Sequence, residues 1–102
     1  MTRVLIVDDS PTETHVLREM LEKHDYQVSV ADNGEDGLKI AQEMAPDVIL
    51  MDIVMPGVNG FQATRKLSKD PATASIPVVI ISTKDQDTDR IWGLRQGARD
   101  YI

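Results

Sequence analysis

The chain has 102 residues, a formal net charge of -6 at neutral pH and no cysteine. This length supports one domain over residues 1–102, with a small core. The acidic balance argues against direct binding to nucleic acid or to an anionic membrane surface, because both require a basic patch. The missing cysteines exclude disulfides and thiolate metal sites. No apolar run has the length of a signal peptide or a transmembrane span, so the expected location is the cytoplasm.

Strand-like and helix-like patterns alternate from the first residues onward. Residues 4–7 form a short continuous apolar run, which is typical of buried parallel strands. Ser10 can cap a helix that starts at Pro11, and Glu13 would complete a capping box. Residues 26–31 then alternate, as the residues of an edge strand do, and Asp32-Asn33-Gly34 predicts a turn.

The same alternation continues to the end of the chain. The remaining expected elements, in order, are a helix marked by Leu38, Ala41 and Met44 and stopped by Pro46, a strand over 48–51, a helix over 61–68, a strand over 78–81, a helix marked by Ile91, Leu94 and Ala98, and the start of a fifth strand at 100–102.

Strands that alternate with helices predict an α/β fold, namely a doubly wound parallel sheet covered on both faces. Ligands of such sheets sit beyond the carboxyl ends of the strands. The polar residues that end the apolar runs are Asp8 and Asp9, Asp52, and Ser82. If the strand order is 2-1-3-4-5, these three carboxylates and one hydroxyl converge on one small site.

Three ionised carboxylates in one site repel each other, and a hard divalent cation relieves that repulsion. Mg²⁺ prefers a few oxygen ligands together with water and phosphate. A carboxylate beside Mg²⁺ is a competent nucleophile toward phosphorus, and the product is an acyl phosphate. The predicted site therefore suits acceptance of a phosphoryl group.

Several segments resemble one known family in order and spacing. These segments are residues 4–10, 50–56, 59–60, 77–82 and 97–101. They are similar to the CheY-like receiver domains of two-component response regulators, which implies a five-stranded flavodoxin-like sheet of order 2-1-3-4-5. Residues 60–65 and 84–86 further resemble the PilH-type receivers of twitching-motility systems.

The resemblance implies a role for each site residue. Asp52 would take the phosphoryl group from a histidine kinase, and the modified chain would change its binding to a downstream protein target. The chain would catalyse only its own phosphorylation and dephosphorylation, and it would not be an enzyme for external substrates. The implied Mg²⁺ ligands are Asp8, Asp9, Asp52 and the backbone oxygen of Val54. The implied phosphoryl-binding and switch residues are Ser82, Thr83 and Tyr101, and Trp92 would belong to a partner surface.

The sequence departs from the family pattern at its end and at two site positions. The family carries a lysine two positions beyond Ile102, then a proline and a fifth helix. We therefore expect a C-terminally incomplete receiver domain that could self-associate, and Lys84 could partly replace the lysine. Thr83 stands where the family usually has alanine or glycine. Val54 is apolar at a position that tunes hydrolysis, which implies a persistent acyl phosphate.

Other interpretations of the same residues stay open. Asp8 and Asp9 could be ordinary acids near a helix start, and Trp92 could be an ordinary residue at the flank of a helix. An aspartyl-phosphate phosphatase of the haloacid-dehalogenase type is one alternative function, although its Asp-x-Asp pattern is missing after the first strand. A third possibility is an interaction module that kept the fold and lost phosphorylation.

Overall fold

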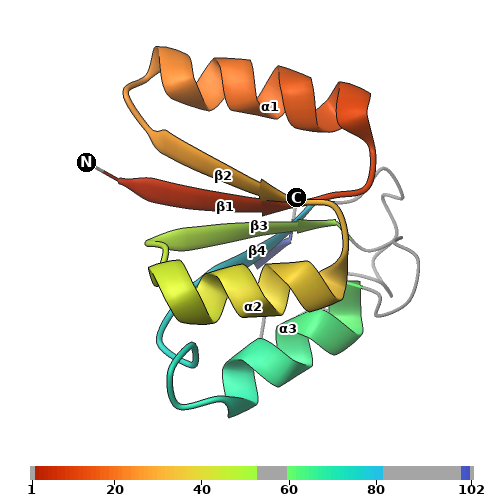
Figure 1. Cartoon of the computed structure of the whole chain (residues 1–102), viewed down its shortest axis with the longest axis vertical. Helices are drawn as coiled ribbons and strands as arrows, with labels where there is room; N and C mark the ends of the chain where they lie inside the picture. The colour runs from red at the N-terminus through yellow and green to blue at the C-terminus, as the bar shows by residue number, and fades with distance from the viewer. Residues whose placement is uncertain (1, 53–59, 82–99, 102) are drawn as a thin grey trace.

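The computed structural model describes residues 2–52, 60–81 and 100–101. Its centre is a parallel sheet of five strands in the order β2-β1-β3-β4-β5 (Figure 1). The strands are β1 (Arg3–Val7), β2 (Gln27–Ala31), β3 (Val48–Asp52), β4 (Val78–Ile81) and β5 (Asp100–Tyr101).

Three helices are described, and they lie on both faces of this sheet. They are α1 (Pro11–Lys23), α2 (Gly34–Met44) and α3 (Gly60–Lys69). Figure 1 shows α1 on one face, with α2 and α3 together on the other. The predicted doubly wound parallel sheet is thus confirmed over β1 to β4. Strand β5 is described over two residues, which pair with β4. The helix predicted around Ile91, Leu94 and Ala98 lies outside the described residues.

The main core lies between the sheet and the pair α2 and α3. Strand β1 is buried on both faces, as its continuous apolar run predicts. In β3 and β4, buried residues alternate with half-buried ones. In β3, for example, Ile49 and Met51 are fully buried and Leu50 is half-buried. The core cluster consists of Leu5, Val7, Ala31, Ala41, Ile49, Met51, Ala63, Leu67 and Val78.

Short polar side chains begin the helices that follow β1 and β2. Ser10 Oγ accepts a hydrogen bond from the backbone N–H of Glu13 at 3.3 Å, as the predicted cap requires. In a full capping box, the Glu13 side chain would accept a hydrogen bond from the Ser10 N–H. Here the Ser10 N–H donates to Asp8 Oδ1 instead, at 2.9 Å. The predicted capping box is therefore confirmed for the bond that Ser10 accepts and wrong for the bond that Glu13 would accept. Asn33, predicted to lie in a turn, is the N-cap of α2.

Candidate metal centre

The acidic residues predicted to converge do meet at the carboxyl edge of the sheet. Asp8 directly follows β1, and Asp52 is the last residue of β3. Val7 of β1 pairs with Met51 of the parallel neighbour β3. The residues that follow them, Asp8 and Asp52, therefore lie side by side at the edge of the sheet. One oxygen from each of Asp8, Asp9 and Asp52 lies within 4.8 Å of the others.

The three acids differ in how firmly the protein holds them. Asp8 is 4% exposed, and its Oδ1 accepts the hydrogen bond from the Ser10 N–H. Its own N–H donates to the Ala31 carbonyl at 3.0 Å, which ties the start of the site to β2. Asp9 is exposed, and Asp52 is half-buried. The cluster is therefore anchored at Asp8 and open to solvent at Asp9.

A fourth carboxylate lies beside this cluster. The pKa of Glu13 is raised above its ordinary value of 4.5, first by a hydrogen bond with Asp8 and by the charge of Asp8. Burial and the charges of Asp52 and Asp9 raise this pKa further. The sequence predicted Glu13 only as a capping residue. Its place in the first turn after Asp8 and Asp9 is the signal that could have placed it near them.

The chemistry of the donor set fits a hard divalent cation. Like charges about 4 Å apart repel by roughly 4 kcal/mol at the effective dielectric of a protein surface. Three carboxylates within 4.8 Å of one another carry that repulsion, and a cation between them removes it. All the donors are oxygen atoms, which suits Mg²⁺ better than softer metals. Asp8, Asp9 and Asp52 are the described residues that would hold it.

The other predicted site residues are placed less fully. Val54, Ser82, Thr83, Lys84 and Trp92 lie outside the described residues. Tyr101 lies in β5, where its backbone pairs in register with Ile80 of β4. The structure thus brings together the three acids, and the roles of the remaining residues stay predictions.

In the part of the chain that the structure describes, no helix combines the length and the apolar character that crossing a membrane would require.

Comparisons with known proteins point to one family. The model of the response regulator receiver domain matches residues 4–102. Protein PilH of Pseudomonas aeruginosa is 65% identical over 102 residues, which are 100% of this chain and 84% of that protein. Response regulator PleD of Caulobacter vibrioides is 44% identical over 98% of this chain, which spans only 22% of PleD.

Solved structures agree with the sequence relatives. Chemotaxis protein CheY4 of Vibrio cholerae has a TM-score of 0.94 at 27% identity, covering 100% of this chain and 85% of that chain. The receiver domain of a sensor histidine kinase from Pseudomonas aeruginosa has a TM-score of 0.91 at 28% identity, covering 99% and 83%. That structure holds a magnesium ion coordinated in the active site cleft. The predicted CheY-like, PilH-type resemblance is confirmed, and the chain belongs to the response regulator receiver domain family.

Proposed function

We propose that the chain is a signalling switch that accepts a phosphoryl group on Asp52 from a histidine kinase and then changes its binding to a downstream protein. The observation that carries this proposal is the convergence of Asp8, Asp9 and Asp52 at the carboxyl edge of the sheet. Asp52 is the last residue of β3, which lies between β1 and β4 in the sheet.

The chain's own residues would divide the work of phosphoryl transfer. Asp8 and Asp9 would hold Mg²⁺, which supplies positive charge for the phosphoryl oxygens when it is bound. A carboxylate oxygen of Asp52 would attack phosphorus, so that an O–P bond forms while the P–N bond to the donor imidazole breaks. The imidazole leaves with the bonding electron pair and takes up a proton from solvent. Hydrolysis of the resulting acyl phosphate would return Asp52 to its starting state.

The likeness to Protein PilH supports a more specific setting. We propose that the switch acts in the cytoplasm, in control of type IV pili and twitching or in a chemotaxis-like system. Its partners would be a histidine kinase and a protein target, and it would turn over no external substrate. The further roles proposed for Val54, Ser82, Thr83, Tyr101 and Trp92 rest on the family resemblance.

Phosphorylation can be tested by intact mass after incubation with Mg²⁺ and a small phosphodonor. We expect the wild type to gain the mass of one phosphoryl group, and Asp52→Asn to gain none. Asp32→Asn is the matched control, because Asp32 follows β2 at the same edge of the sheet but is outside the acidic cluster.

Two results would contradict the proposal. The first is an equal mass gain in the wild type and in Asp52→Asn, which would place the phosphoryl group elsewhere. The second is steady release of phosphate from small phosphate esters, which would favour a phosphatase.

A further inference from the structure

The outer edge of β2 carries backbone groups that no described strand pairs with. Strand β2 is first in the strand order, and its one described neighbour is β1. The Gln27 N–H donates to the Thr2 carbonyl, and the Ala31 carbonyl accepts from the Asp8 N–H. Because successive residues of a strand direct their backbone groups to opposite sides, Val28 and Val30 direct theirs away from β1.

Within the described part of the chain, residues 26–31 lack the charge, the proline and the bulge that usually protect an edge strand. Natural edges are blocked by charged side chains, proline, bulges or a covering element. Residues 26–31 contain neither a charge nor a proline. The pairing with β1 is regular over all five residues of β2. The edge is therefore able to accept an additional strand.

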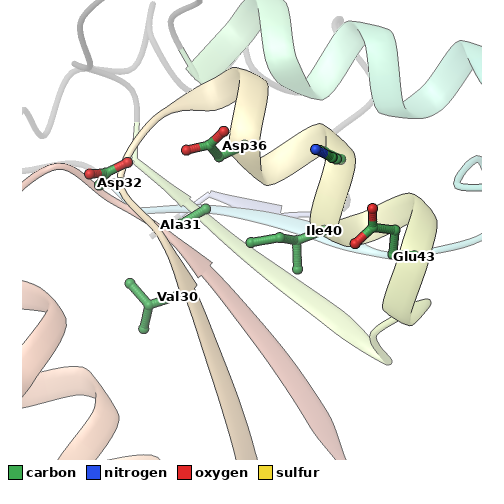
Figure 2. Close-up of a pocket in the computed structure, with 7 residues that line it drawn as sticks. Val30, Ala31, Asp32, Asp36, Ile40 and Glu43 are labelled. Carbon is green, nitrogen blue, oxygen red and sulfur yellow. The ribbon is translucent and has the colours of Figure 1, made fainter.

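An open groove of about 570 Å³ runs beside this edge, between β2 and α2. Figure 2 shows Ile40 between two acidic ends of the groove, with Asp32 and Asp36 at one end and Glu43 at the other. Its apolar lining is Val30, Ala31 and Ile40, and its charged lining is Asp32, Asp36, Lys39 and Glu43. Three carboxylates against one ammonium group make the groove acidic.

We propose that the β2 edge and this groove form a docking site for an extended segment of a partner protein, in which apolar residues alternate with lysine or arginine. Backbone pairing with Val28 and Val30 would align the segment, as in strand addition to a sheet edge. Alternate side chains of an added strand lie on opposite faces of the sheet. The cations of the segment would therefore lie on the α2 face, with their aliphatic stems beside Ile40 and their charges facing Asp36 and Glu43, and its apolar side chains would lie on the other face.

The charge of the groove selects this occupant over two others. A second copy of the chain would bring an identical acidic groove against the first one. Nucleic acid would bring phosphates, which the same carboxylates repel. The inference does not depend on the proposed phosphoryl acceptance, because Asp8, Asp9 and Asp52 line no part of the groove.

The test is a titration of the full chain with a short, end-blocked peptide of alternating valine and lysine, followed by amide NMR. We expect saturable shifts at Val28 and Val30, slower hydrogen exchange of their N–H groups, and weaker binding as salt is added. Two control peptides separate the contributions. Glutamate in place of lysine should abolish binding, and N-methylation of the backbone should remove the exchange protection.

Two variants locate the contact. Glu43→Lys should weaken binding of the lysine peptide about ten-fold, and lysine near the C-terminus of α2 is compatible with the helix. Glu19→Lys changes the net charge equally on α1, outside the groove, and should leave affinity unchanged. Val30→Pro removes one outward N–H and should abolish the protection of Val28.

Three results would overturn the proposal. The first is the absence of shifts at Val28 and Val30 in the wild type. The second is equal binding of the lysine and glutamate peptides. The third is protection of these two N–H groups without peptide that grows with protein concentration, because a second copy would then occupy the edge.

Discussion

Glu13 shows how one side chain couples the acidic site to stability. Its pKa is raised, first by hydrogen bonding to Asp8, so the folded chain holds this proton more tightly than the unfolded chain does. The stabilising contribution is complete below the ordinary pKa of 4.5 and is lost as the pH rises through the raised value. We therefore expect Glu13→Gln to be more stable than the wild type at neutral pH without metal, by less than about 1 kcal/mol because the group is largely exposed.

Urea unfolding at several pH values, with a chelator present, measures this difference. The gap between Glu13→Gln and the wild type should widen from acidic to neutral pH. Glu35→Gln serves as the control, because Glu35 also lies in the first turn of a helix but is outside the acidic cluster. A gap for Glu13→Gln that is independent of pH would show that its proton is not coupled to folding.

At the scale of elements, the close approach of α2 to β1 depends on Gly37. A Cβ at this position would lie 2.8 Å from Val7 Cγ2 and 3.0 Å from Val7 Cγ1. Val7 is fully buried and β-branched, so it has little freedom to move. Overpacking costs about 1–3 kcal/mol, whereas alanine gains about 1 kcal/mol of helix propensity. We expect Gly37→Ala to lower the free energy of unfolding by about 1 kcal/mol.

The double variant with Val7→Ala tests the cause. If the clash with Val7 is responsible, Gly37→Ala should cost less in the Val7→Ala background than in the wild type. Lys39→Ala, at an exposed position of the same helix, should change stability little. Equal costs for Gly37→Ala in both backgrounds would assign the loss to another contact.

The elements also show which features a sequence pattern can predict. The continuous apolar run of β1 predicted a strand that is buried on both faces, and β1 is one. The alternation in residues 26–31 predicted an edge strand, and β2 lies at the edge of the sheet. Strand ends placed Asp8 and Asp52 at one edge, because parallel strands end on the same side. The capping pattern predicted that the Glu13 side chain would bond back to Ser10, but Glu13 instead lies beside Asp8. The sequence pattern could not predict this, because the direction of the side chain depends on the acidic site that the fold brings together. Asn33 was predicted to lie in a turn but is the N-cap of α2. The sequence does not separate these two cases, because asparagine is favoured both in turns and at helix N-caps.

At the scale of the whole molecule, the three described helices cover the two faces of the sheet unequally. The face under α2 and α3 holds the main core. On the other face no residue of α1, a helix that is described in full, is fully buried, and Val16 and Met20 are each 54% exposed. Leu50 and Val79, which pair in register, are only half-buried. This uneven coverage leaves apolar surface beside α1 that a second copy could cover.

We expect the chain to self-associate through this α1 face, so its thermal stability should depend on protein concentration. For a dimer that unfolds to monomers, each ten-fold rise in concentration should raise Tm by about 3–5 °C in a domain of this size. Met20→Lys should remove this dependence, because it places a charge in the contact. Tyr26→Lys is the matched control, since Tyr26 is another exposed apolar residue, 39% exposed, next to β2. A sedimentation profile of a monomer at every concentration, together with a constant Tm, would show that the face stays open to solvent.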